Sequence, residues 1–236
     1  MKTRLLLAVL GTLGISHALS DAAVISINVG ANGTVSGPAG AVVAGNWTNL
    51  FGSDQSSSNL IDDSALATTL DAAFIGGANT FNNFGGNDKN MLTGFLSGGT
   101  VNVTLTQVPY ATYDVYVYFN GFGDNNNNTW QASDVTDPGN PSLVDQMTSF
   151  RGTQDTFTFH AANGHVESAL NTPGTYVKFT GMNVASLRIA RTAGSGEIGI
   201  SGIQVVDTSA AIPEPTTALA LGLGAGLFAL RRRRIA

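Results

Sequence analysis

The chain has 236 residues and no cysteine, which excludes disulfides, a thiol nucleophile and cysteine metal sites. Between residues 24 and 208 there are five basic and fourteen acidic side chains, so this part carries a net charge of −9. An acidic surface repels phosphate backbones, which argues against nucleic acid as a partner. The length of this part fits one domain that folds on its own hydrophobic core.

Residues 1–22 have the organisation of a secretory signal peptide. Lys2 and Arg4 come before the apolar run LLLAVLGTLGI, which the small residues of SHALSDAA follow. The apolar run is short for a bilayer, which favours a cleaved signal helix over a permanent anchor, with a buried N-terminal helix as the alternative. The sequence fits cleavage after any of three residues, Ala18, Ser20 or Ala22. We therefore predict that the chain is exported.

Residues 24–208 contain short segments with the patterns of β-strands: VISINV, VNVTLT, YDVYVYF, DTFTFH, ASLRIAR and EIGISGIQVV. Clusters of Gly, Asn, Asp and Ser separate them, and VPYAT at 108–112 predicts a turn that joins two antiparallel strands. Helical periodicity is absent apart from a turn expected near residues 64–70. The fold class that we predict is all-β, an antiparallel β-sandwich of the jelly-roll type, flanked by the N-terminal signal helix and a C-terminal hydrophobic helix.

The aromatic residues of the predicted domain have two kinds of expected role. Alternation places Tyr113, Val115, Val117 and Phe119 on one face of the strand YDVYVYF. Tyr116 and Tyr118 share the other face, where they form either an exposed aromatic platform or, as we favour, a pair packed beneath a loop. Trp47, within GNWTNL, is expected in the core.

The segment 120–141 is polar and rich in Asn, Asp and Gly, which predicts a loop or a short strand between two loops. Sugars are bound by an exposed aromatic plane together with amide and carboxylate hydrogen bonds. The candidate carbohydrate-binding residues are therefore Phe122, Asp124, Asn126 and Trp130, with burial of Trp130 between the sheets as the alternative.

Asp124 is also the candidate metal ligand, because calcium accepts carboxylate, amide and backbone oxygens in loops. The surrounding NGFGDNNNNTW lacks the D-x-D-x-D-G order of a calcium loop, and an Asn run is more often a turn. Calcium is thus one option here, and no other cofactor is expected.

No catalytic constellation is visible in the chain, so we predict that it is not an enzyme. His160 and His165 do not have the spacing of a zinc-binding HExxH helix, no G-x-S-x-G turn is present, and both histidines are expected at the solvated surface. Asp62 and Asp63 are adjacent, so in a strand they would point to opposite faces. Glycosidases need two facing carboxylates, which the sequence alone does not reveal.

The C-terminal part, residues 209–236, has three features in a fixed order. Pro213, Glu214 and Pro215 are followed by an uncharged apolar segment at 216–230 and then by the arginine cluster of residues 231–234. A helix of this length spans ~23 Å, which is short of the roughly 30 Å hydrocarbon core and makes a marginal permanent anchor. The arginines would stay on the cytoplasmic side and leave the main domain on the other side of the membrane.

These features resemble the PEP-CTERM sorting signal of Gram-negative bacteria, with the motif at Pro213, Glu214, Pro215 and the basic residues Arg231, Arg232, Arg233 and Arg234. The resemblance covers about 25 residues. It implies that exosortase, a membrane-embedded transpeptidase-like cysteine protease, cleaves near the Pro-Glu-Pro motif and discards the helix. The expected localisation is transient anchoring in the inner membrane, followed by the cell surface or extracellular matrix.

A second resemblance concerns the predicted domain. ISINVG near its start, VTLTQVPYATYDVYVYFNG in its middle and ISGIQVV at its end are similar to malectin-like and galactose-binding-like jelly rolls. The turn in the middle departs from that pattern, since Ala111 stands where the family usually has Gly. Many such modules bind carbohydrate through loops at one end of the sandwich.

Taken together, the sequence predicts an exported, non-enzymatic surface or extracellular-matrix protein, sorted by exosortase and associated with exopolysaccharide. The alternative is a lectin-like carbohydrate-binding module with a loop site near Trp130, and the third option is a glycan-active enzyme. The expected partners are exosortase, exopolysaccharide and, transiently, the inner membrane.

Overall fold

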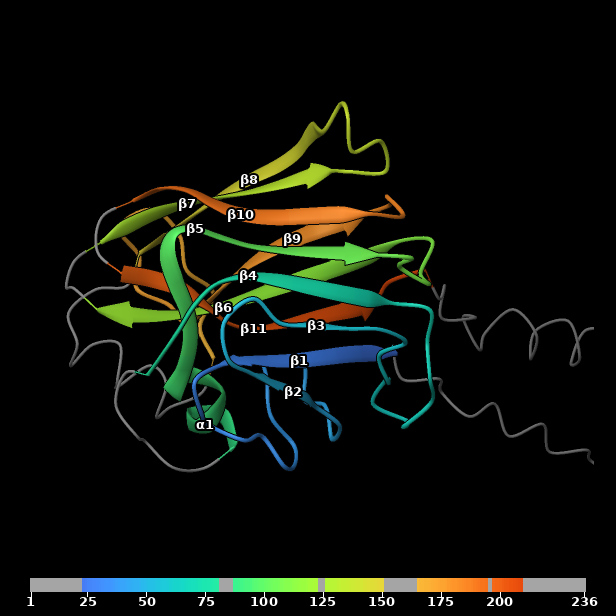
Figure 1. Cartoon of the computed structure of the whole chain (residues 1–236), viewed down its shortest axis with the longest axis horizontal. Coiled ribbons are helices and arrows are strands. Elements are labelled where there is room, and N and C mark those ends of the chain that lie inside the picture. Colours follow the sequence, from blue (N-terminus) through green and yellow to red (C-terminus); the bar gives the residue numbers. More distant parts are fainter. Residues whose placement is uncertain (1–22, 81–86, 123–125, 151–164, 195–196, 210–236) are drawn as a thin grey trace, which may run out of the picture. The chain divides into compact units, whose positions relative to one another are not determined.

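The structure, a computed structural model, describes the chain at residues 23–80, 87–122, 126–150, 165–194 and 197–209. Residues 22–211 form one compact unit. Within the described residues the unit contains eleven strands and one short helix (Figure 1). They are β1 (Val24–Gly30), β2 (Thr48–Phe51), β3 (Ser56–Ser57), β4 (Asp71–Thr80), α1 (Asn87–Thr93), β5 (Gly94–Thr106), β6 (Tyr113–Phe122), β7 (Asn127–Asp134), β8 (Ser142–Phe150), β9 (Tyr176–Met182), β10 (Leu187–Gly194) and β11 (Glu197–Asp207).

Strand pairing arranges the eleven strands in two groups. One group has the order β3-β4-β5-β10-β7-β8, with every neighbour antiparallel. The other has the order β2-β1-β11-β6-β9, in which β1 and β2 are parallel and the remaining pairs antiparallel. The two groups are joined where β5 pairs with β11, at Leu96 and Ile200. The domain is therefore mostly β, as predicted, but the sheet is mixed because β2 runs parallel to β1.

The junction between β5 and β11 depends on a glycine that allows two backbones to approach closely. A Cβ atom built on Gly199 would lie 1.5 Å from the carbonyl oxygen of Leu96. Any other residue at this position would therefore force β5 away from β11. Glycine is needed at position 199 because there is no room for a side chain, and its backbone φ angle is not in the left-handed region.

The hydrophobic core lies between the two groups, and the alternation predicted from the sequence accounts for much of it. The residues of β6 expected on one face are all fully buried: Tyr113, Val115, Val117 and Phe119. On β5 and β10 the predicted inward positions are buried too, namely Val101, Val103, Leu105, Leu187 and Ile189. Each buried aliphatic or aromatic side chain of this kind stabilises the fold by roughly 1.5–3 kcal/mol.

The second group of strands is covered on its outer side as well. Ser26 of β1, Gln204 of β11 and Tyr118 of β6 face away from the core, yet each is at most 1% exposed. The segment 31–47 lies over them, since the backbone N–H of Ala41 donates to the Tyr118 hydroxyl at 2.7 Å. Tyr118 thus packs beneath a loop as favoured from the sequence, and Trp47 is buried as expected.

Several local predictions differ from the structure. The helical turn expected near residues 64–70 is absent, and Asp62 Oδ1 there accepts hydrogen bonds from the backbone N–H groups of Ser64 and Leu66. The described helix is instead α1, a short element that buries Met91 and Leu92. The turn at 108–112 leads from β5 into β6, but these two strands belong to different groups and do not pair. The connection thus crosses from one layer to the other.

The polar segment 120–141 includes the end of β6 and the whole of β7, which agrees with the alternative of a strand between two loops. The predicted signal helix, the C-terminal hydrophobic helix and the strand DTFTFH lie outside the described residues. In the part of the chain that is described, no helix has the length and apolar character needed to cross a membrane.

Candidate functional site

Trp130, the centre of the predicted sugar-binding site, lies in the core. On β7 the side chains of Trp130 and Ala132 are fully buried, while Thr129, Gln131 and Ser133 are partly exposed. The indole Nε1 donates to Ser149 Oγ at 2.8 Å, and the ring centroid lies 6.2 Å from that of Phe119. The prediction of an exposed stacking surface at Trp130 is therefore wrong. Alternation along β7 turns this position inward, and Ser149 satisfies the indole N–H there.

Of the other predicted sugar-binding residues, the structure describes the side chain of Asn126 alone. Asn126 is 9% exposed, and Phe122 is the last residue of β6, opposite Glu197 in the strand pairing. Asp124 lies outside the described residues, and so does any calcium site built on it. Elsewhere in the described ranges, no group of three or more His, Asp or Glu side chains is placed to hold a metal ion.

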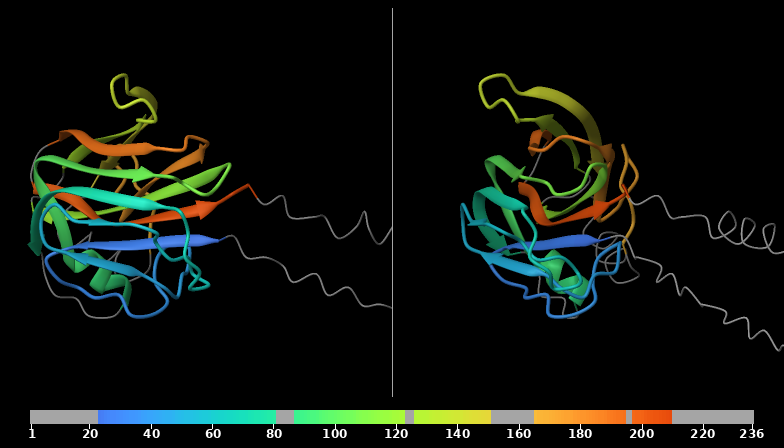
Figure 2. Two further views of the ribbon diagram at one scale, coloured as in Figure 1. Left: turned by 45° about the vertical axis from the view of Figure 1, so that its right-hand side comes forward. Right: turned by 90° about the vertical axis from the view of Figure 1, so that its right-hand side faces the viewer.

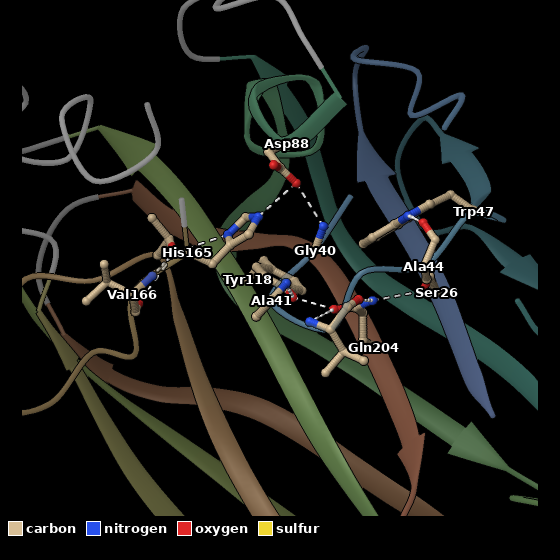
Figure 3. A network of polar contacts seen from close by, with 12 residues as sticks. Ser26, Gly40, Ala41, Ala44, Trp47, Asp88, Tyr118, His165, Val166 and Gln204 are labelled. Atoms are coloured by element: carbon tan, nitrogen blue, oxygen red, sulfur yellow. Dashed lines mark hydrogen bonds and ion pairs between the residues drawn. The ribbon is translucent and has the colours of Figure 1, made fainter. Parts of the chain in front are cut away.

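His165 is buried and hydrogen-bonded, so the prediction of a solvated surface histidine is wrong for this residue. Its side chain is 4% exposed, and Nε2 lies 3.1 Å from Asp88 Oδ1 (Figure 3). Nδ1 lies 3.3 Å from the hydroxyl of Thr175, and the ring meets that of Tyr118 edge-on at 5.0 Å. The histidine is thus held on three sides by groups from distant parts of the chain. His160 lies outside the described residues.

Asp88 joins this histidine to the loop that covers the second group of strands. Its Oδ1 also accepts the backbone N–H of Gly40 at 2.8 Å (Figure 3). The hydrogen bond from His165 and then that from Gly40 lower the pKa of the Asp88 carboxyl, against an opposing effect of partial burial. The carboxylate therefore fastens the loop and the segment beginning at His165 to the first turn of α1.

An acid, a histidine and a hydroxyl in sequence also occur in hydrolase triads, so the geometry around Thr175 decides between catalysis and structure. Thr175 is fully buried, and its Oγ1 accepts the backbone N–H of Val166 at 3.1 Å. A nucleophile must reach its substrate, which this hydroxyl does not. The arrangement of Asp88, His165 and Thr175 supports a structural role. Asp88 and His165 are 77 residues apart, so no spacing in the sequence could have linked them.

A second buried network, next to the first, is centred on Gln204. Its Oε1 accepts the Tyr118 hydroxyl, and its Nε2 donates to Ser26 Oγ at 3.0 Å and to the carbonyl of Val42 at 2.7 Å (Figure 3). The Tyr118 hydroxyl in turn accepts the N–H of Ala41. The contacts with Ala41 and Val42 hold the loop onto the strands, and those with Ser26 and Tyr118 link the strands beneath it. Burial of Tyr118 raises its pKa, so the phenol stays neutral.

Asp62 and Asp63 are also used by the fold. The carboxylate of Asp63 accepts the backbone N–H of Val24 at 3.1 Å, where β1 begins. That of Asp62 accepts N–H groups of its own turn, including that of Ser64 at 2.9 Å. The two carboxylates thus bind different parts of the backbone, as expected if they do not act together on a substrate.

One hollow of the described surface lies on the outer side of the first group of strands. It is a groove of about 250 Å³, lined by Thr104, Thr106, Val135, Pro138 and Arg188. Its floor consists of side chains from β5 and β10, and its wall comes from the connection between β7 and β8. The sequence indicated outward positions for Thr104, Thr106 and Arg188, but the wall depends on the tertiary structure.

No protein-family model matches the chain, and no curated protein matches it significantly.

Proposed function

We propose that this chain is an exported protein of the bacterial cell surface or extracellular matrix, non-enzymatic and associated with exopolysaccharide. The observation that carries the proposal is the order of features at the C-terminus: the motif of residues 213–215, the apolar segment 216–230 and the arginines 231–234. Each has a physical role in sorting, since prolines interrupt regular structure, an apolar segment enters the bilayer and arginines set its orientation.

The proposed processing has two cuts. A signal peptidase removes residues 1–22 during export, and an exosortase-type protease cleaves near the Pro-Glu-Pro motif. The length of segment 216–230 supports a temporary role, because a helix of ~23 Å is short for a permanent span. The part that reaches the surface would then be the β domain alone.

For this domain we propose a jelly-roll topology related to galactose-binding-like modules. Support comes from the two groups of mostly antiparallel strands around one core and from the crossing connection between β5 and β6. A binding role as a lectin-like module is the second candidate function. The groove beside Arg188 favours it, in place of the loop site near Trp130.

The experiment that tests the sorting proposal is the intact mass of the protein recovered from the cell surface. The expected mass lacks residues 1–22 and the segment from 216 onward. A variant with Ala at positions 213–215 should keep its tail and stay with the membrane, whereas Ala at the nearby Thr208 and Ser209 should be processed normally. Recovery of a mature protein that still carries the sequence LRRRR would refute the proposal.

A further inference from the structure

The groove on the outer side of the first group of strands has a floor of aligned polar side chains. Arg188 lies directly opposite Thr104 on one side and Ser133 on the other. Directly opposed residues of antiparallel strands point to the same face, and the neighbours of Arg188, Leu187 and Ile189, are buried in the core. Thr104, Arg188 and Ser133 therefore form a row across three strands on the solvent side.

A second row lies next to the first and has amide side chains on both sides of Ala190. Asn102, Ala190 and Gln131 are opposed in the same way, and Gln131 donates to Gln146 of β8 at 2.9 Å. Amide and hydroxyl groups that both donate and accept hydrogen bonds thus cover this part of the sheet. Sugar hydroxyl groups also donate and accept, so the surface is suited to a polysaccharide chain.

The wall of the groove is apolar and rigid. Val135 and Pro138 belong to the connection between β7 and β8, which projects beyond the other strands (Figure 2). Asp137 Oδ1 accepts the N–H of Gly139 at 3.0 Å, and the N–H of Val135 donates to the carbonyl of Ser186 at 3.0 Å. The apolar C–H face of a sugar ring can pack against such a wall while its hydroxyl groups reach the floor.

Two other basic side chains of the described residues, Lys178 and Arg191, make polar contacts within the protein, and Arg188 differs from them. Lys178 forms an ion pair of 2.8 Å with Asp114, and Arg191 donates to the carbonyl of Gly98 at 2.9 Å. Within the described ranges, Arg188 makes no hydrogen bond or ion pair. Arg188 lines the groove, and a guanidinium offers a planar set of donors that matches a carboxylate.

From these observations we propose that the groove binds an acidic polysaccharide, with Arg188 pairing with the carboxylate of a uronic acid unit. The proposal rests on the proposed association with exopolysaccharide and gives it a site and a ligand class. A volume of about 250 Å³ is below the roughly 300–1,000 Å³ of pockets that enclose a small molecule. The groove therefore holds a short part of a longer chain.

The surrounding charge restricts which acidic polysaccharides fit. Asp71 lies on the same face, opposite Thr106, and its two oxygens accept from the N–H of Asn59 and from Gln107 Nε2. The domain as a whole is acidic, so a densely charged polymer would be repelled. The ligand that fits is a chain in which carboxylate-bearing units alternate with neutral ones.

The test measures binding of the mature protein to four polymers: hyaluronan, xanthan, alginate and the exopolysaccharide of the producing organism. Each is used in its native form and after reduction of its carboxyl groups to alcohols. The native chain should bind at least one native polymer, prefer hyaluronan or xanthan, in which neutral sugars separate the carboxylates, to the denser alginate, and lose affinity on carboxyl reduction. Arg188→Gln should weaken binding by about tenfold or more, and Arg188→Lys by less, since it keeps the charge but not the planar set of donors.

Lys89→Gln is the matched control, because it makes the same change of charge on helix α1, outside the groove. It should leave affinity unchanged. If the native chain binds and Arg188→Gln binds equally well, the proposed site is wrong. The site is also wrong if Lys89→Gln weakens binding as much as Arg188→Gln does. In both cases the association with polysaccharide stands. If the carboxyl-reduced polymers bind as tightly as the native ones, the proposed pairing of Arg188 with a carboxylate is wrong. Binding to none of the four overturns both the ligand and the association, while the sorting proposal is decided by the intact mass alone.

Discussion

Replacing Tyr118 by Phe tests whether the buried polar network holds the covering loop in place. The substitution keeps the ring and its contacts but removes the hydroxyl that accepts the N–H of Ala41 at 2.7 Å and donates to Gln204. Both partners are then left in a buried place with one hydrogen bond fewer. The backbone N–H of Ala41 loses its acceptor outright, whereas Gln204 Oε1 keeps a weak contact with the N–H of Val42 at 3.4 Å.

The expected loss follows from the number of groups left unpaired. A buried donor or acceptor without a partner costs about 1–3 kcal/mol, and here one such group is fully orphaned. We therefore expect Tyr118→Phe to lower the free energy of unfolding by about 2 kcal/mol. For a domain of this size, that corresponds to a fall in the melting temperature of about 4–8 °C.

The assay is thermal and urea unfolding of Tyr118→Phe beside Tyr116→Phe, which changes the same group two residues away on the same strand face. Tyr116 is partly exposed, and its ring contacts Tyr176 and Lys178 at the edge of the covered region. Loss of the Tyr116 hydroxyl should lower the free energy of unfolding by less than about 0.5 kcal/mol. A Tyr118→Phe protein as stable as the native chain, or an equal loss in both variants, would refute the reasoning.

Three further perturbations test other parts of the structure. The pKa of Asp88 is lowered in the folded state, so its contribution to stability is full above the ordinary pKa near 3.8 and is lost as the pH falls through the lower folded value. Asp88→Asn should therefore flatten the acid limb of stability, measured by urea unfolding at a series of pH values beside the native chain. Gly199→Ala should prevent folding, as judged by circular dichroism and proteolysis, because its Cβ would lie 1.5 Å from a carbonyl oxygen, whereas Gly99→Ala enters open space and should fold normally. Trp130→Ala should lower the free energy of unfolding by about 3–5 kcal/mol in urea, since it empties a fully buried site; a small loss would mean that the indole is exposed after all.

Much of the strand layout follows from the sequence, because alternation is a local property. The pattern YDVYVYF assigns each side chain of β6 to one of two faces, and the residues predicted for the core face are all buried. The helix at residues 87–93 was not anticipated, since its seven residues are too few to show a helical period. Its boundaries follow from packing, as Met91 and Leu92 reach the core.

Alternation alone did not predict the candidate sites. Alternation says that Trp130 and Arg188 each have a defined face, but it does not say which face of a strand meets solvent. That depends on which strands become neighbours, and the partners of β10 are β5 and β7, which both come earlier in the chain and are not consecutive. The tertiary structure therefore places Trp130 inside, and it leaves Arg188 on an open groove.

What the sequence by itself determined is the strand patterns and the order of features at both ends, because these depend on neighbouring residues alone. What only the tertiary structure decided is the pairing of His165 with Asp88, the identity of the residues that cover Tyr118 and the groove at Arg188. Each of these brings together residues that are far apart in the chain, and such contacts form only when the sheets close around a common core.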